Sequence, residues 1–440
     1  MSKFRTQHMS LQWHDMIDEE NTAPAVDADL KEKAMLVGRV GLMMLSVGTG
    51  AWRVRASMNK IARALDIVCV ADIGLLSIEY TCASNGETFT NALSLSNTGV
   101  NTDKLTELEL FADGFAERAG KYSIGQFHSI LDKFQEMPAN YKAIQLALAS
   151  ALACCGFTFL LGGGAAEMIL AFFGAGVGQF VRKKLLERHI TLLANVAAAV
   201  AAACTTYVLL MKVGQVFFGL SEAHQAGYIC SMLFVIPGFP LITGGIDLAK
   251  LDLRSGLERV TYALLIIIMA TLTGALMAAC FSYHPADFKE QSMDDGMKIL
   301  LRLITSFCGV YGFSFLFNSK RKMACTAGLI GMIANTLRLE LIDFTEIPVP
   351  AAAFIGALSA GLMASAIKRF IGYPRITLTV PSIVIMVPGM FMYKGIYYLG
   401  MNDIQAGSMW LSKAVLIVMA LPLGLVFARI FTDKNFRKSS

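Results

Sequence analysis

Two proline–glycine pairs are the sequence's clearest candidates for chemistry. Pro237-Gly238 and Pro388-Gly389 each stand near the middle of a long apolar run. Proline removes an amide donor and glycine weakens the next helical turn, so each pair should break a helix. In hydrocarbon the freed backbone groups are tolerable where they line a wet cavity, where amides attract a carboxylate and carbonyls an ammonium. We predict that these four residues bind substrate; the alternative is that each pair only kinks a helix for packing.

Charged residues within or beside the apolar runs are the second set of candidates, because burying charge in a membrane span is costly. They are Glu167, Asp247, Arg259, Arg338 and Lys394. Asp247 could instead cap a helix or pair with Arg259, Glu167 could be an interfacial anchor, and Lys394 could bind a substrate carboxylate or snorkel to the surface.

Small polar residues in the same runs could line a path for the substrate. The candidates are Ser231, Thr243, Asn335 and Ser382. Such residues also form hydrogen bonds between helices, so each is a weak signal by itself.

Enzymatic and metal motifs are missing from the sequence. It holds no G-x-S-x-G, H-E-x-x-H or Walker lysine loop, and its nine cysteines form neither C-x-x-C nor a zinc spacing. The net charge of +5 lies in short loops, without a basic stripe that interleaves with aromatics. We therefore expect no enzyme activity, no cofactor, no metal and no nucleic-acid partner.

The elements that must position these residues are membrane helices. The chain has 440 residues, of which 55% are hydrophobic and 16% charged, against about 25% charged in soluble proteins. The charge deficit lies after Tyr141, and about 20 apolar residues cross a bilayer. The apolar runs predict about ten spans, at residues 143–163, 165–181, 190–211, 226–245, 257–281, 297–317, 323–338, 349–367, 378–399 and 410–431. The runs at 165–181 and 323–338 are short and could dip or tilt.

Loop charge orients the spans, since positive residues favour the cytoplasm. With the N-terminus inside, the lysines and arginines gather in the cytoplasmic connections at 182–188, 250–259, 320–322 and 368–375 and in the C-terminal tail. We therefore predict a multi-pass inner-membrane protein with both termini in the cytoplasm.

The polar N-terminal part predicts a small cytoplasmic α/β domain. Residues 1–30 are polar and read as a disordered tail, and residues 31–140 as the domain. Two helical pieces join near Gly48-Thr49-Gly50, three strands follow at 67–71, 75–80 and 88–93, and helical periodicity returns. The domain's only histidine, His128, is more typical of a surface or core position than of a catalyst. We predict a structural or regulatory domain.

The membrane part reads as two repeats, at 141–283 and 284–433, with a cytoplasmic tail at 434–440. Each Pro-Gly stands in the fourth run of a set of five. Because five is odd, the second set must be inverted relative to the first, which is typical of secondary transporters. The predicted fold is an α-helical polytopic membrane protein of two inverted five-helix repeats.

Several of these residues form a family pattern. Pro237-Gly238-x-Pro240-Leu241, then Asp247-Leu248 and Ser255-Gly256-x-x-Arg259, resembles the signature of the threonine/serine exporter family. Pro381-Ser382 with Pro388-Gly389 looks like that family's smaller second module, and Gly41 to Leu65 is similar to its cytoplasmic region. After Val54 the family pattern leads us to expect an acid, where this chain has Arg55.

The resemblance implies export of threonine and serine driven by the proton motive force. Such an exporter needs a carboxylate that can be protonated; Asp247 is the first candidate and Glu167 the second, with Arg259, Lys394 and Arg338 as charge partners. The expected partners are a small-molecule substrate, protons and the lipid bilayer, and a homo-oligomer is compatible with the sequence.

Three alternatives stay open. Relatives with the two modules on separate chains are associated with dicarboxylate export, which would need two cations, such as Lys394 with Arg259 or Arg338. A membrane-embedded enzyme with a soluble catalytic domain lacks its catalytic set. A channel lacks a polar stripe along a helix.

Overall fold

The computed structural model describes residues 11–18, 20–283, 288 and 293–437. Contacts divide the chain into two units, which we describe separately. Unit 1 comprises Met1–Ala139 with Lys250–Glu258, and unit 2 comprises Asn140–Ala249 with Arg259–Ser440.

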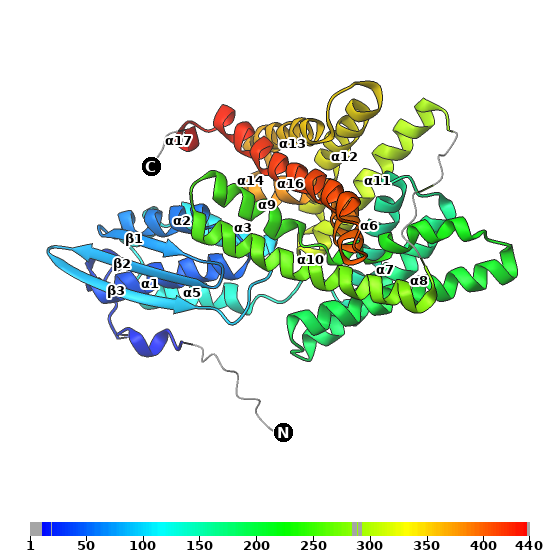
Figure 1. The fold of residues 1–440 in the computed structure, drawn as a ribbon. Helices are drawn as coiled ribbons and strands as arrows, with labels where there is room; N and C mark the ends of the chain where they lie inside the picture. Colours follow the sequence, from blue (N-terminus) through cyan, green and yellow to red (C-terminus); the bar gives the residue numbers. More distant parts are fainter. Residues whose placement is uncertain (1–10, 19, 284–287, 289–292, 438–440) are drawn as a thin grey trace. The chain divides into compact units, whose positions relative to one another are not determined.

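Unit 1 is built on a three-stranded antiparallel sheet in the order β1-β2-β3 (Figure 1). The strands are β1 (Val68–Ile73), β2 (Ser77–Ser84) and β3 (Glu87–Ser94). Asn85 and Gly86 have positive φ angles of 50° and 82° in the turn that joins β2 to β3, as a tight hairpin requires. Because short turns join consecutive strands, the sheet is antiparallel rather than the parallel sheet of a βαβ domain.

Five helices accompany this sheet. Two pack against it, namely α1 (Leu30–Ser46) and α2 (Ala51–Ala64), and Gly48 between them has a φ of 85°. The others are α3 (Thr102–Asp113), α4 (Ala116–Ala119) and α5 (Ile124–Glu136). The predicted strands and the predicted helix break all lie within a few residues of the observed ones.

The N-terminal segment differs from the predicted disordered tail of residues 1–30. Residues 1–10 and 19 lie outside the described residues, but the remainder contains the 3₁₀ turns η1 (His14–Met16) and η2 (Ala25–Asp27). Trp13 is 9% exposed, and its ring stacks on that of His128 at 6.2 Å between centroids. One large aromatic side chain therefore anchors a segment whose composition is otherwise polar.

His128 lies in the core of unit 1. Its side chain is fully buried, and its Nδ1 lies 2.9 Å from Nη1 of Arg39, which is also buried. Burial, and then the Arg39 charge, lower the pKa of His128 to about 3, with a smaller opposing effect from Asp132. The histidine is therefore neutral at physiological pH and acts as a packing and hydrogen-bonding residue.

The loop between α9 (Gly238–Ala249) and α10 (Leu253–Phe281), together with the first six residues of α10, supplies residues 250–258 to unit 1. Arg55 Nη1 lies 2.6 Å from Asp252 Oδ1, and the Leu75 amide donates to Glu258 Oε2 at 2.5 Å. Arg254 pairs with Asp72. Arg55, where the family pattern led us to expect an acid, therefore has its own acidic partner in this loop.

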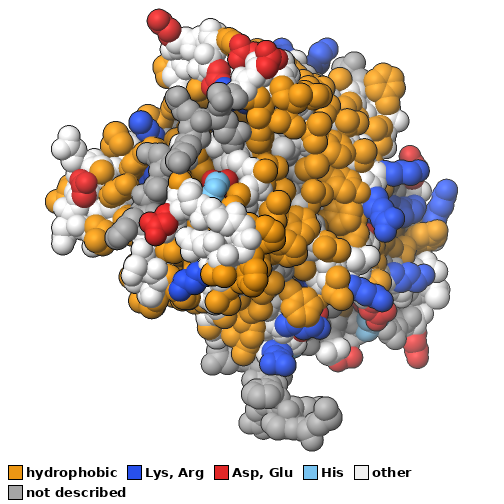
Figure 2. Space-filling model, turned by 90° about the vertical axis from the view of Figure 1, so that its right-hand side faces the viewer, with side chains coloured by type: hydrophobic (Ala, Val, Ile, Leu, Met, Phe, Trp, Pro, Cys, Tyr) orange, Lys and Arg blue, Asp and Glu red, His pale blue; other side chains and the backbone are white. Residues whose placement is uncertain are grey.

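Unit 2 consists of helices, several of them long. Besides α9 and most of α10, it contains α6 (Ala143–Leu160), α7 (Ala165–Glu187), α8 (Leu192–Phe218), η3 (Glu222–Val235), α11 (Asp295–Leu316), α12 (Arg321–Phe344), α13 (Val349–Ile371), α14 (Arg375–Ile383), η4 (Val384–Met386), α15 (Gly389–Gly400), α16 (Ile404–Thr432) and α17 (Lys434–Arg437). Hydrophobic side chains cover much of the face in Figure 2, and lysines and arginines gather at one margin.

Among the described residues, seven helices are long and apolar enough to cross a membrane. Two further spans are bent pairs, η3 with α9 at 60° and α14–η4 with α15 at 48°, which brings the number to nine. The tenth predicted span corresponds to α7, which has 23 residues, and ten spans stay a prediction. The runs predicted as short belong to α7 and α12, of 23 and 24 residues, because polar residues extend both helices beyond their apolar stretch.

The two sets of helices pack in corresponding ways. Helix α7 contacts η3, the first half of one bent pair, and α12 contacts α14, the first half of the other. Helices α6 and α11 contact each other reciprocally through glycine. A Cβ on Gly156 would lie 2.6 Å from the Thr305 carbonyl, and one on Gly312 would lie 2.4 Å from the Ala149 carbonyl. Such close backbone approach needs glycine on each helix.

Unit 1 should lose stability as the pH falls from 6.5 toward 3, because the unfolded chain then binds a proton that buried His128 does not. Between pH 6.5 and 5 this amounts to about 2 kcal/mol. Urea unfolding followed through Trp13 fluorescence, in a W52F/W410F background, should show this slope, and His128→Gln should flatten it. Equal slopes in the two proteins would contradict the assignment.

Candidate functional site

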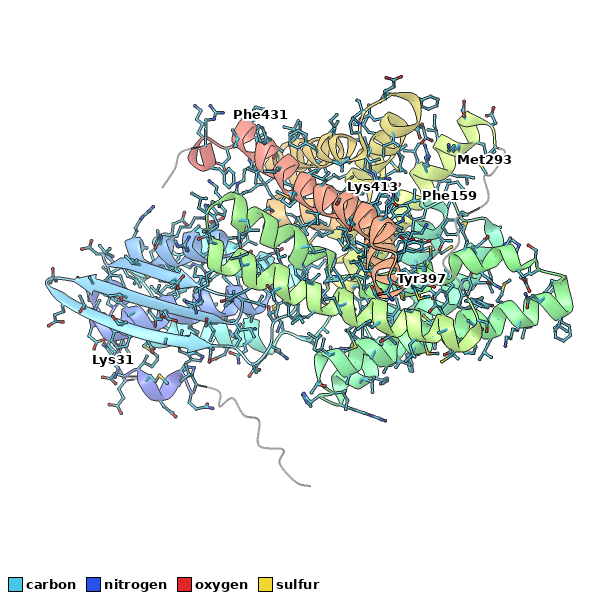
Figure 3. The ribbon with its side chains drawn as sticks, in the orientation of Figure 1. Lys31, Phe159, Met293, Tyr397, Lys413 and Phe431 are labelled. Carbon is cyan, nitrogen blue, oxygen red and sulfur yellow. The ribbon has the colours of Figure 1, made fainter. Side chains whose placement is uncertain are left out.

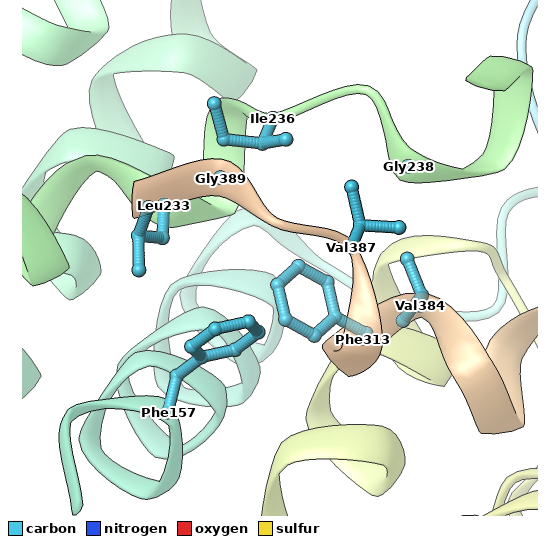
Figure 4. Close-up of a pocket in the computed structure, with 8 residues that line it drawn as sticks. All are labelled: Phe157, Leu233, Ile236, Gly238, Phe313, Val384, Val387 and Gly389. Carbon is cyan, nitrogen blue, oxygen red and sulfur yellow. The ribbon is translucent and has the colours of Figure 1, made fainter. Parts of the chain in front are cut away.

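The two Pro-Gly breaks lie against each other (Figure 4). A Cβ on Gly238 would lie 2.6 Å from Val384 Cγ2, and one on Gly389 would lie 3.2 Å from Ile236 Cγ1. Each glycine therefore faces side chains just before the other break. The structure brings together all four residues that the sequence singled out as a backbone site.

Both breaks have the same local geometry. The Gly238 amide donates to the Ile236 carbonyl at 2.9 Å, and the Gly389 amide donates to the Val387 carbonyl at 2.8 Å. These are γ-turns centred on the two prolines. The first amide of each half-helix is therefore already bonded, so a carboxylate would need later amides or side chains.

The cavity at the breaks is small, about 10 Å³, which is room for about one water molecule. Its lining side chains are apolar and come from four elements and the breaks themselves, namely Phe157, Leu233, Ile236, Phe313, Val384 and Val387. Bare backbone was predicted to line a wet cavity here. In this conformation the breaks are instead packed under apolar side chains, and the charged groups lie elsewhere.

Asp247 and Arg259 form a buried ion pair. Asp247 Oδ2 lies 3.3 Å from Arg259 Nε, and both side chains are at most 2% exposed. Asp247 is on α9, which follows the first break, and Arg259 is on α10. The ion-pair alternative for Asp247 is thus the observed one, and it puts a carboxylate and a guanidinium in a site without bulk water.

Glu167 has two partners. Its Oε2 accepts from the Gly164 amide at 3.0 Å, which caps α7, and its Oε1 lies 2.8 Å from Nδ1 of His224. His224 is on η3, and Tyr207 donates to its carbonyl at 2.6 Å. Sequence analysis missed His224, because 57 residues separate it from Glu167 and no motif joins them. The pair links α7 to the first half of a broken span through two groups that can exchange a proton.

Lys394 is buried rather than snorkelling. Its side chain lies on α15 and is 6% exposed, and its Nζ lies 4.8 Å from the centre of the Trp410 ring. Lys413, labelled in Figure 3, approaches the same ring at 5.2 Å. The ring face provides a cation–π contact for both ammonium groups.

The four predicted path-lining residues are all buried but differ in their bonding. Ser231, Thr243 and Ser382 donate to carbonyls three or four residues back in their own helices. Asn335 instead donates across helices, from its Nδ2 to Ser306 Oγ at 2.9 Å. Asn335 thus uses its side chain between α12 and α11.

Arg338 lies within α12, six residues before its end at Phe344, and not at the end of a span as predicted. Its Nη1 donates to the Met386 carbonyl at 3.4 Å, just before the second break. A helix break leaves carbonyls without an intrahelical donor, and Arg338 reaches one of them.

Comparison with known proteins assigns the chain to a family. The sequence profile of the ThrE threonine/serine exporters matches residues 35–281, more than half of the chain, and a second profile, "Threonine/Serine exporter, ThrE", matches residues 302–431. The chain belongs to the threonine/serine exporter family. It carries both family modules in one polypeptide, with one Pro-Gly break in each.

Named relatives of this exporter-family chain fall in two groups. A "Probable threonine/serine exporter" of Mycobacterium tuberculosis is 22% identical over 95% of this chain and 78% of its own length. "Probable succinate transporter subunit YjjP" of Escherichia coli is 26% identical over 54% of this chain and 90% of its own length, and the Klebsiella aerogenes protein of that name is 26% identical over 54% and 89%. No solved structure matches the chain.

The contact between the breaks can be tested in this exporter-family protein by adding single methyl groups. Gly238→Ala should lower stability by about 1–3 kcal/mol through overpacking against Val384, and Val384→Ala in the same chain should recover part of the loss. Thermal unfolding in detergent measures both. Gly400→Ala is the control, since a Cβ there meets nothing within 4 Å. Additive effects of the two substitutions would show that the breaks do not touch.

Proposed function

We propose that this protein is a secondary active exporter of small hydrophilic metabolites, with threonine and serine as first candidates, driven by the proton motive force. One observation carries the proposal: two bent spans with the same γ-turn at Pro-Gly meet at their breaks. Paired broken helices in repeated modules are a common framework of secondary transporters. Membership of the exporter family supports transport over the membrane-embedded enzyme.

The arrangement supports alternating access by two inverted repeats. Helix α7 would be the tenth span, and an odd number of spans per repeat would invert the second module. The reciprocal glycine contacts of α6 and α11 fit such a pair of modules. With both termini in the cytoplasm of the inner membrane, the breaks would form the pivot near the centre of the bilayer.

Proton coupling is assigned to the Asp247–Arg259 pair. Protonation of Asp247 would remove its charge and leave the Arg259 guanidinium buried without compensation, which is costly. Deprotonated Asp247 could instead bind the ammonium of an outgoing amino acid, so proton binding and substrate binding would compete, as the exchange of substrate for incoming protons requires. Glu167 with His224 is the second candidate, at the start of the same broken span.

Dicarboxylate export is the alternative, favoured by the similarity to proteins named as succinate transporter subunits. A dicarboxylate needs two cations. Lys394 and Arg338 belong to the second module and Arg259 to the first, and these are the cations that we propose for such a site.

Reconstituted vesicles with an imposed pH gradient test the proposal through the flux of threonine, serine and succinate. The parent protein should move at least one of them faster with the gradient than without it. Asp247→Asn should abolish the stimulation by the gradient, since the amide cannot be protonated in this range. Asp295→Asn, which changes an exposed carboxylate at the start of α11, should leave it unchanged.

Two results would contradict the proposal separately. If none of the three solutes moves, with or without the pH gradient, the exporter assignment fails. Stimulation that persists in Asp247→Asn removes only the coupling role of Asp247, and the same measurement on Glu167→Gln then tests the second candidate.

A further inference from the structure

An amide and an arginine recur at the same place in the second helix of each module. Gln179 and Arg182 are the fifteenth and eighteenth residues of α7, which begins at Ala165. Asn335 and Arg338 are the fifteenth and eighteenth residues of α12, which begins at Arg321. The three-residue spacing puts amide and guanidinium on one face of each helix.

The pair on α12 has unused hydrogen-bonding capacity. Asn335 is fully buried, and among the described residues neither its Oδ1 nor the buried hydroxyl of Thr336, the next residue, has a hydrogen-bond partner. Arg338 is half-buried with a fully buried Nε, and its described bond is the long one to the Met386 carbonyl. Buried polar groups usually have hydrogen-bond partners. A ligand with hydrogen-bonding groups would supply the partners that this cluster lacks.

The charges around Arg338 indicate what kind of ligand the group on α12 would bind. The neighbouring carboxylates of Glu340 and Asp343 are already engaged by Arg302, at 2.9 and 2.8 Å. Among the described residues no carboxylate forms an ion pair with Arg338, and the nearby Arg302 carries the same charge. A guanidinium in such a place favours an anion from outside the chain.

The pair on α7 repeats these features. Gln179 is 7% exposed, and its Oε1 has no partner. Within the described part of unit 2, no carboxylate forms an ion pair with Arg182. The Tyr262 side chain lies close enough to interact with its charge. Asn195 donates to the Arg182 carbonyl at 3.1 Å and keeps a buried Oδ1 without a partner.

We propose that Arg338 with Asn335, and Arg182 with Gln179, are two carboxylate-binding sites, one in each module. The guanidinium binds the two oxygens of a carboxylate through a planar fork of N–H donors. The amide oxygen accepts from a second group of the same ligand, such as an ammonium or a hydroxyl. The ligand class is therefore a small carboxylate that also carries a hydrogen-bond donor.

The sites rest on the proposed exporter function and refine it. If the modules are inverted, the eighteenth residues of α7 and α12 lie toward opposite sides of the membrane. One arginine then receives the substrate carboxylate from the cytoplasm and the other holds it before release. The apolar cavity at the breaks lies between these two steps and needs no charge of its own.

Binding experiments on the purified full-length protein test the sites. L-Threonine and L-threoninol, which lacks the carboxylate, are titrated separately by calorimetry, and side-specific half-saturation is measured in vesicles with oriented protein. Arg338→Gln should weaken threonine binding from one side by about tenfold or more, and Arg182→Gln from the other. Weak binding of threoninol should change in neither variant.

Control variants separate binding from folding. Lys322→Gln removes an exposed charge from the same helix α12 and should change nothing. Arg338→Lys keeps the charge without the fork, should fold with an unchanged melting temperature, and should recover only part of the affinity. Comparable loss of threonine and threoninol binding in Arg338→Gln would assign the residue a structural role and overturn the proposal.

The failure of the sites can be told apart from the failure of the exporter function. Flux in the parent protein with unchanged half-saturation in both arginine variants overturns the two sites alone. Absence of flux and of binding in the parent protein overturns the exporter function together with the sites.

Discussion

The contact between the two Pro-Gly breaks is the constraint on which the rest of unit 2 depends. Each proline interrupts a helix, and each γ-turn recovers a bond for the glycine amide that follows. Gly238 has no room for a Cβ, which would lie 2.6 Å from Val384 Cγ2, and Gly389 is packed tightly, since a Cβ there would lie 3.2 Å from Ile236 Cγ1. Each break is therefore covered in part by side chains of the other module.

Buried cations of this unit are neutralised in different ways. Arg259 has a carboxylate at 3.3 Å, Lys394 has an aromatic ring, and Arg338 has a single backbone carbonyl. A carboxylate compensates a buried charge far better than a ring or a carbonyl dipole does. Of the two arginines, the less compensated Arg338 therefore gains more from an arriving anion, whereas Arg259 already has its carboxylate. This order separates a binding role from a coupling role.

The breaks, the three strands and the buried charges could be predicted because each depends on local residue types. Pro-Gly in an apolar run or Asn85-Gly86 between strands specifies its backbone within a few residues. The Glu167–His224 pair and the stacking of Trp13 on His128 depend on tertiary packing, which no local pattern encodes. The apolar lining of the cavity could not be predicted from the sequence either. Broken backbone reveals which groups lose their bonds but not which side chains cover them.

The segment 250–258 comprises the loop 250–252 and the first six residues of α10, and it follows the buried Asp247 closely in the chain. The segment belongs to unit 1 by its contacts, through Arg55–Asp252 and Glu258 with the Leu75 amide. The residues that flank it in the chain, Asp247 and Arg259, form the buried ion pair of unit 2. Residues 253–258 are helical, so Arg259 is held by α10 and Asp247 by α9. The three loop residues between the two helices therefore set how closely the two side chains approach.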